Sequence, residues 1–93
     1  MDENKIIITV SGTDKVGIVA SIASILSKCK ANIEDIKQTL MQGHFVMFML
    51  CDIKNSEITF KELKNALIEE GNRLELEIWV QKKGIFEKMH TIN

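Results

Sequence analysis

Residues 11–20 read Ser-Gly-Thr-Asp-Lys-Val-Gly-Ile-Val-Ala, and the periodicity of the sequence changes within them. Before them, residues 5–11 are rich in β-branched side chains that alternate with the period of two expected for a strand. From Gly17 to about Lys30, apolar residues recur instead at helical spacing. The stretch therefore predicts a turn between a strand and a helix, with Asp14 as the N-cap of that helix.

The segment after this helix predicts a hairpin. Residues 33–41 alternate weakly and carry charged side chains, which favours an edge strand. Residues 42–43, Gln-Gly, form a short turn into residues 45–51, which are apolar at nearly every position. A strand that is apolar on both faces is expected to be buried on both sides.

A second helix and a fourth strand complete the pattern. Thr59 and Glu62 have the spacing of a capping box, and the helix is expected over residues 60–70. Gly71 is predicted to end it in the left-handed conformation. Residues 74–81 then alternate between apolar and polar side chains, as a fourth strand does.

The predicted order β-α-β-β-α-β is that of the α+β ferredoxin-like fold. In this fold two helices cover one face of an antiparallel sheet with strand order 4-1-3-2. We assign residues 1–83 to this domain and residues 84–93 to a C-terminal tail with the spacing of a short amphipathic helix. The helices leave one sheet face open, and the apolar residues on it are either Val46, Phe48 and Leu50 or Phe45, Met47 and Met49. A second layer is therefore expected, made by another subunit, the tail, or both.

Length and composition limit the classes of function. The chain has 93 residues, 45% of them hydrophobic, and a net charge of −1. A chain this small buries roughly 60–65% of its unfolded surface, so a partner subunit would add to a limited core. The near-zero net charge argues against a nucleic-acid partner, and no apolar run is long enough for a membrane helix. The polar N-terminus and the isolated Cys29 and Cys51 predict a cytoplasmic protein with reduced thiols.

The sequence lacks the residues that several other functional classes with this fold require. A soft-metal carrier needs a Cys-x-x-Cys pair in the first loop, and a phosphate cradle needs more arginine than the lone Arg73. Phe45 and Phe48 lie on opposite strand faces, so they cannot form one base-stacking platform. His44 and His90 have no neighbouring nucleophile or carboxylate in the sequence. We therefore predict no enzymatic activity, no metal and no cofactor.

Residues 11–20, together with Asn32-Ile33, carry a more specific signal. With the Gly43 hairpin and the element order, they closely resemble the ACT domain, a regulatory module that binds small molecules. The resemblance spans residues 4–82, and the sequence is most similar to small stand-alone ACT proteins and to glycine-cleavage-regulator-like members. In ACT domains that bind amino acids, the site commonly lies between subunits, where the first loop of one chain faces the second strand of its neighbour.

The resemblance implies a ligand site at seven positions. These are Gly12, Thr13, Asp14, Gly17, Ile18, Asn32 and Ile33. The chemistry suits a zwitterion, because a helix N-terminus at Gly17 favours a carboxylate and Asp14 can hold an ammonium group. The Asn32 amide can both donate and accept hydrogen bonds. The alternative is that Asp14 only caps the helix, Gly17 only permits tight packing and Asn32 only shapes a turn.

The resulting expectation is a non-catalytic homodimer that senses an amino acid or a similar small ligand. With no room for a second domain, it would pass the signal to a separate, unidentified protein partner. The alternative is a dimeric protein-interaction module that binds no ligand. In that case Asp14, Lys15 and Asn32 would contact one another and leave no cavity.

Overall fold

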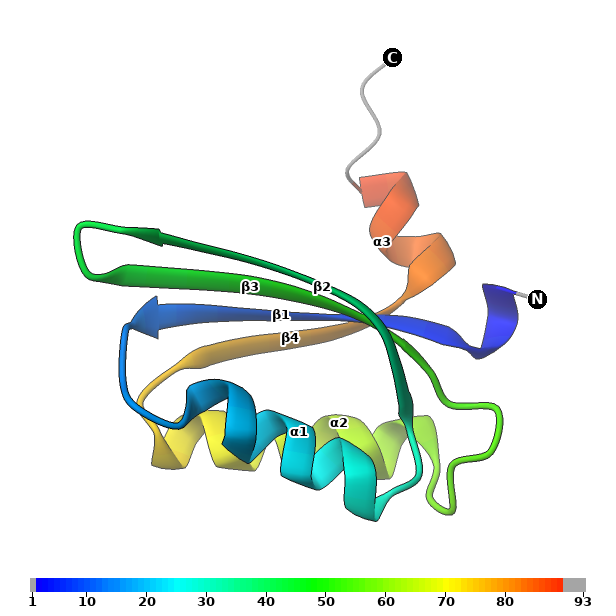
Figure 1. The fold of residues 1–93 in the computed structure, drawn as a ribbon. Coiled ribbons are helices and arrows are strands. Elements are labelled where there is room, and N and C mark those ends of the chain that lie inside the picture. Colours follow the sequence, from blue (N-terminus) through cyan, green and yellow to red (C-terminus); the bar gives the residue numbers. More distant parts are fainter. Residues whose placement is uncertain (1, 90–93) are drawn as a thin grey trace.

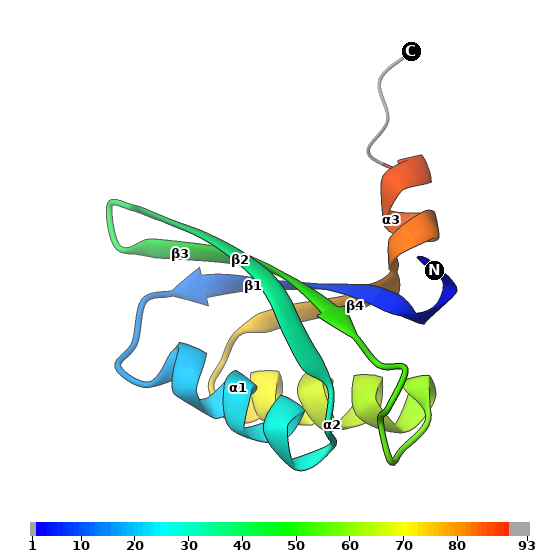
Figure 2. The same ribbon diagram turned by 45° about the vertical axis from the view of Figure 1, so that its right-hand side comes forward.

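A computed structural model of the chain describes residues 2–89. The elements in chain order are η1 (Asp2–Asn4), β1 (Lys5–Thr13), α1 (Ile18–Lys28), β2 (Asn32–Met41), β3 (His44–Asp52), α2 (Phe60–Arg73), β4 (Glu77–Lys82) and α3 (Lys83–Met89). The strands form one antiparallel sheet with the order β2-β3-β1-β4. Helices α1 and α2 lie side by side under one face of the sheet, and α3 projects from the other face (Figures 1 and 2). The predicted ferredoxin-like fold and strand order are confirmed.

The core lies between the sheet and the two long helices. Its fully buried side chains include Ile6, Ile8 and Val10 of β1, Met47, Met49 and Cys51 of β3, Ile22 and Leu26 of α1, and Leu63 and Leu67 of α2. The alternation predicted for β1 is therefore correct. In β3 the side chains that face the helices are Phe45, Met47, Met49 and Cys51. Val46, Phe48 and Leu50 are consequently the ones on the open face, which settles the choice that the sequence left open.

The start of α1 differs from the prediction. The N-cap is Gly17, with a φ of 88°, and no side chain caps the helix. Asp14 lies too early in the loop to act as a cap, so that assignment was wrong. Its backbone N–H instead donates to the Gly43 carbonyl oxygen at 2.9 Å, which ties the loop to the β2–β3 turn.

The end of α2 also differs. Gly71 lies inside the helix, which continues to Arg73, and the left-handed residue is Glu75 with a φ of 59°. A Cβ on Gly71 would lie 2.9 Å from Ile78 Cδ1, so the glycine allows close packing between α2 and β4. Because Leu74 to Leu76 form the turn, β4 begins at Glu77 and is shorter than expected.

Strand β2 is an edge strand, as predicted, and every residue except Ile33 is exposed. The hairpin turn has positive φ at both Gln42 and Gly43, which suits the twist of the strands. The sequence did not predict the irregularity between Ile33 and Asp35, where β2 has an extra residue relative to β3. Because of it, Ile33 and Ile36 lie on the same face of the strand, the face toward the helices.

Helix α3 supplies part of the expected second layer. It contacts β1, β4 and η1, and the Phe86 ring meets Phe48 edge-on with 6.2 Å between the ring centroids. The tail therefore forms a short helix over the open face, as predicted, although Ile92 and His90 lie outside the described residues. A covering subunit stays a prediction. Within residues 2–89, no helix combines the length and the apolar character needed to span a lipid bilayer.

Candidate functional site

Gly12, near the end of β1, and Gly17, at the N-cap of α1, have different roles. A Cβ on Gly12 would lie 2.6 Å from Leu76 Cδ2, so Gly12 is needed for packing inside the chain. A Cβ on Gly17 would meet nothing within 4 Å, so the space above Gly17 is open. The tight-packing explanation therefore fits Gly12 and does not fit Gly17 within one chain.

No side chain caps the backbone N–H groups at the start of α1. The helix also has no acidic residue in its first turn. The first backbone N–H groups of a helix have no intrahelical acceptor, and the aligned peptide dipoles make that end positive. The loop around it is exposed at Thr13, Asp14 and Val16. This arrangement can accept an anionic group such as a carboxylate.

Lys15 does not join Asp14 and Asn32 in a cluster. Its ammonium group donates to the Leu74 carbonyl oxygen and lies 3.7 Å from Glu75 Oε1. The positive charge is thereby directed toward the α2–β4 turn and away from Asn32, which begins β2. Within one chain, the closed contact expected for a ligand-free interaction module is not formed.

A pocket of ≈290 Å³ lies beside this loop, under the β2–β3 hairpin. It is lined by Asp14, Gln38, Thr39, Leu40 and Phe45. A carboxylate, an amide and a hydroxyl thus meet two apolar side chains, which is the mixed character of a site for a small polar ligand. Of these residues, sequence reasoning had named only Asp14 as a site residue. The signal for the others was the alternation that places Gln38 and Leu40 on one face of an otherwise polar edge strand.

The predicted site residues fall into two groups. Gly12, Thr13, Asp14, Gly17 and Ile18 lie around the start of α1. Asn32 and Ile33 follow the other end of the helix, which at 11 residues is about 16 Å long. Ile18 is buried in the core, and Asn32 is exposed. One chain therefore brings the first group together and leaves the second group at the far end of the helix.

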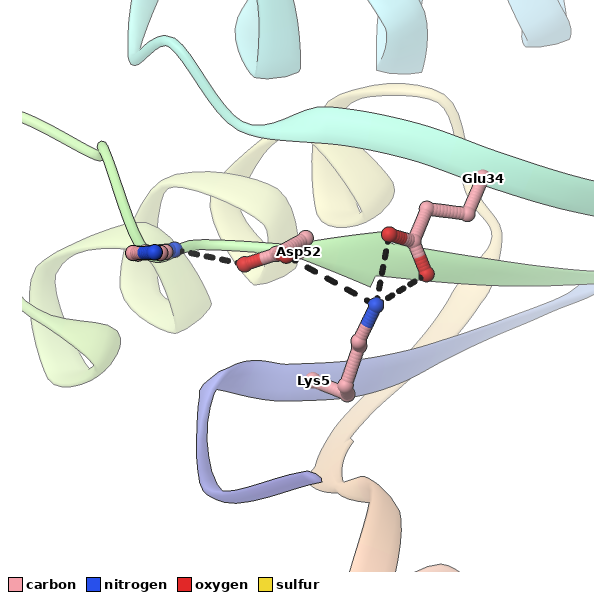
Figure 3. Close-up of polar contacts among 4 residues, drawn as sticks. Lys5, Glu34 and Asp52 are labelled. Carbon is pink, nitrogen blue, oxygen red and sulfur yellow. Dashed lines mark hydrogen bonds and ion pairs between the residues drawn. The ribbon is translucent and has the colours of Figure 1, made fainter. Parts of the chain in front are cut away.

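An ion cluster fixes the position of Asn32 and Ile33. Lys5 Nζ lies 2.6 Å from both carboxylate oxygens of Glu34 and 3.6 Å from Asp52 Oδ2 (Figure 3). Glu34 is the extra residue at the β2 irregularity, so Lys5 connects that point to β1 and β3. Hydrogen bonding to Glu34 raises the pKa of Lys5, which stays charged at neutral pH. The Lys54 N–H, which donates to Asp52 Oδ1, is the main reason that the pKa of Asp52 is lowered.

The described residues contain no group of His, Cys, Asp and Glu suited to holding a metal ion. His44 Nε2 lies 3.1 Å from the Ser11 hydroxyl oxygen. Cys29 and Cys51 are free thiols, and burial raises the pKa of Cys51 to about 12. The Cys51 thiol is therefore protonated and unreactive as a nucleophile at neutral pH.

Comparison with known proteins agrees with the fold. The sequence pattern of the ACT domain matches residues 4–81. The chain belongs to the ACT domain family. Its relatives include a UPF0237 protein of Clostridium acetobutylicum, 48% identical over 95% of this chain and 99% of that one. A UPF0237 protein of Methanocaldococcus jannaschii is 42% identical over 96% of this chain and 99% of its own.

A solved structure, described as an ACT domain protein from Streptococcus pneumoniae, matches 96% of this chain and 97% of its own. Its TM-score is 0.76 and its identity is 32%. The predicted resemblance to small stand-alone ACT proteins is thus confirmed, since relatives of about this length match along almost their whole chains. ACT domains are in general regulatory modules that bind small ligands.

Proposed function

We propose that this ACT domain is a homodimeric sensor that binds an amino acid between its subunits and passes the signal to a separate protein. The observation that carries the proposal is the separation of the two groups of site residues by the length of α1. The exposed loop at Gly17 offers half of a zwitterion site, and the exposed Asn32 offers polar groups that no ligand could reach from that loop within one chain.

Pairing of two β2 edges brings the two groups together. If two copies join their β2 strands antiparallel about a two-fold axis near Lys37, Asn32 of the partner subunit comes to lie close to the β2–β3 turn. That turn is where the Gly43 carbonyl oxygen accepts the Asp14 N–H. The first loop of one chain would therefore face the start of β2 in the other. Edge strands offer unpaired N–H and C=O groups for such pairing.

Exposed apolar side chains support the same interface. On the helix side of β2, Ile36 is 37% exposed and Leu40 is 58% exposed. Both therefore remain exposed in the single chain. An interface along β2 would bury them, which is favourable at about 25 cal/mol per Å² of apolar surface.

The groups around the cavity indicate how an amino acid would lie. The start of α1 suits the carboxylate, and the exposed Asp14 carboxylate suits the ammonium group. Leu40 and Phe45 give the ≈290 Å³ pocket its apolar wall, and Gln38 supplies a polar amide. A small or medium side chain fits a pocket of this size.

Isothermal titration calorimetry against the twenty amino acids tests the proposal. We expect at least one to release or absorb heat at up to millimolar concentration and to raise the melting temperature. Asn32→Ala should abolish that binding, and Asn55→Ala, at an exposed turn position, should leave it unchanged. Absence of binding for all twenty would overturn the sensor and favour the ligand-independent interaction module.

Sedimentation tests the interface itself. Leu40→Asp places a charge on the proposed edge interface and should lower the mass of the particle. A wild-type particle that is monomeric at micromolar concentration would contradict the homodimer.

A further inference from the structure

Strand β4 is the second edge of the sheet and pairs with β1 on its inner side. Its register with β1 runs from Glu77 to Lys82 without an irregularity, and its four central residues, Ile-Trp-Val-Gln, carry no charge. Edge strands in native proteins usually carry charges, proline or a bulge that discourages pairing with another chain. Since β4 has charged residues only at its two ends, its outer edge is open to an added strand.

A groove of ≈240 Å³ lies between this edge and helix α2, which runs below β4 in Figure 1. The groove is lined by Ile68 and Asn72 of α2 and by Leu76, Glu77, Ile78 and Trp79 around the start of β4. An added strand would lie about 4.8 Å from β4 in the hydrogen-bonding direction. The side chains on its helix side would then pack against Ile68 at the wall of the groove.

The two ends of the β4 edge carry opposite charges. At the start of the strand, the Glu77 side chain is exposed. At its end, the ammonium groups of Lys64 and Lys82 lie 6.0 and 5.5 Å from the centre of the Phe60 ring. These contacts place the start of α2 beside the end of β4, so two cations stand together there. A strand with an acidic residue at one end and a basic residue at the other complements both ends.

The turn before β4 joins the groove to the first loop. Leu76 lines the groove, and its Cδ2 lies 2.6 Å from the position that a Cβ on Gly12 would take. In the same turn, the Leu74 carbonyl oxygen accepts a hydrogen bond from the Lys15 ammonium group. Residues 74–76 therefore contact the first loop on one side and the groove on the other, so a change in the loop would reach the groove.

We propose that a separate protein docks in this groove by adding an extended strand to β4, antiparallel like every other neighbouring pair in the sheet. The added strand carries an acidic residue beside Lys82, a basic residue beside Glu77, and apolar residues between them at the positions that face Ile68. The surface goes beyond the proposed amino-acid site and does not depend on it. Both the sensor and the ligand-independent interaction module need a surface for a separate protein.

A second copy of β4 suits the groove less well. If two β4 strands paired antiparallel about a two-fold axis at Trp79, Lys82 of the partner subunit would lie opposite Leu76. With the axis at Val80, Lys82 of the partner subunit would lie opposite Ile78. Leu76 and Ile78 are buried on the helix side of the sheet, and an ammonium group placed there would lose water without gaining an acceptor. A separate chain can place apolar side chains at these positions.

The first experiment uses the peptide Glu-Thr-Val-Thr-Val-Lys, which has the length of β4 and is blocked at both ends so that its termini are uncharged. Paired antiparallel, its glutamate lies beside Lys82 and its lysine beside Glu77. In two-dimensional NMR spectra of the isotope-labelled full chain, we expect amide shifts along β4 and at Ile68 and Asn72. The charge-swapped peptide Lys-Thr-Val-Thr-Val-Glu should cause smaller shifts at the same concentration. Absence of shifts in β4, or equal shifts from the two peptides, would overturn the proposal.

A pair of variants then assigns the binding to the groove. Asn72→Arg adds a long cationic side chain at the end where the lysine of the peptide would lie, and it should weaken peptide binding several-fold. Asn55→Arg, at an exposed turn position outside the groove, should leave peptide binding unchanged. Wild-type affinity for Asn72→Arg would contradict docking in the groove.

Sedimentation of the wild type and of Asn72→Arg tests the other occupant. We expect equal particle masses, since the proposed β2 interface does not include α2. A lower mass for Asn72→Arg would show that a second copy fills the groove and would overturn the proposal. Because the peptide titration contains no amino acid, its result does not depend on whether the first loop binds one.

Discussion

The backbone at Gly17 has a φ of 88°, a conformation in which an L side chain meets its own carbonyl group. Because nothing else lies within 4 Å of a Cβ at this position, the strain is the local cost of any substitution. We expect Gly17→Ala to lower the free energy of unfolding by about 1–2 kcal/mol. For a domain of this size that corresponds to a fall in melting temperature of about 4–16 °C.

Gly84→Ala is the matched control, since Gly84 also has open space around it but lies in α3 without a positive φ. In a helix, alanine is favoured over glycine by about 1 kcal/mol, so this variant should melt at the same or a higher temperature. Equal destabilisation by Gly17→Ala and Gly84→Ala would show that the positive φ of Gly17 is not the cause of the lost stability.

The two cysteines should differ in reactivity. Burial raises the pKa of Cys51 to about 12, while Cys29 is half-buried. At pH 8, a thiol reagent should modify Cys29 quickly and Cys51 only when the protein unfolds, because the thiolate is the reactive form. A reagent that releases a chromophore when it reacts gives the number of modified thiols against time. Mass spectrometry then assigns each modification to Cys29 or Cys51. Simultaneous modification of Cys29 and Cys51 would contradict this prediction.

The raised pKa of Cys51 also implies a pH dependence of stability. The stability due to the neutral thiol is present below about pH 8.5 and is lost as the pH rises toward 12.

At the scale of elements, the alternation of β1 and the stripe of α1 were predictable because one face of each is fully buried. Element ends were less predictable. Gly71 looked like a helix end, yet its lack of a side chain serves the contact with Ile78, a residue seven positions away that only the tertiary fold brings close. The irregularity in β2 had no sequence signal either, and Lys5, which contacts Glu34 at this point, lies 29 positions away in the sequence.

The contribution of the α2 capping box to the free energy of unfolding can be measured. Thr59 Oγ1 accepts the Glu62 N–H at 3.1 Å, and Glu62 Oε1 accepts the Thr59 N–H at 2.9 Å. Thr59→Ala should destabilise the protein by about 1 kcal/mol in chemical denaturation, because the Glu62 N–H loses its side-chain acceptor, while the backbone N–H of residue 59 can still donate to Glu62 Oε1. Thr59→Ser keeps the hydroxyl and should recover most of that loss. If serine is as destabilising as alanine, the cap is not the cause.

The ion cluster at the start of β2 should contribute to acid sensitivity. The pKa of Asp52 is lowered by the Lys54 N–H and by Lys5, so its charged form favours the folded state. That stability is present above the ordinary aspartate pKa of about 4 and is lost as the pH falls through the lower folded value. Asp52→Asn should therefore show a smaller drop in melting temperature between pH 7 and pH 2.5 than the wild type. Asp35→Asn, at an exposed position on the same sheet, is the comparison. An identical pH profile for Asp52→Asn and the wild type would contradict the role of the cluster.

At the scale of the whole molecule, the candidate site depends on where the two ends of α1 lie. The sequence motif identified Gly17 and Asn32 together, but spacing along a chain cannot show that 11 helical residues hold them apart. Alternation in β2 placed Gln38 and Leu40 on one face, but it could not show that Asp14 lines the same pocket, since that depends on the tertiary contact between the first loop and the β2–β3 turn. The structure therefore places the motif residues in two groups at opposite ends of α1, and the homodimer proposed above is what would bring the two groups together.

The division between the domain and its tail is also a property of the whole molecule. The buried core comes from residues 6–80, whereas α3 lies against β1, β4 and η1 and places the Phe86 ring edge-on to Phe48. Removal of residues 84–93 should therefore leave a cooperatively unfolding domain with a lower melting temperature. The loss should include about 0.5–1.5 kcal/mol for the aromatic pair in addition to the apolar surface that α3 buries. Differential scanning calorimetry of the shortened chain and of Phe86→Ala tests this, because the point variant should reproduce part of the decrease. A shortened chain without a cooperative transition would show that α3 belongs to the domain and that the boundary at residue 83 is wrong.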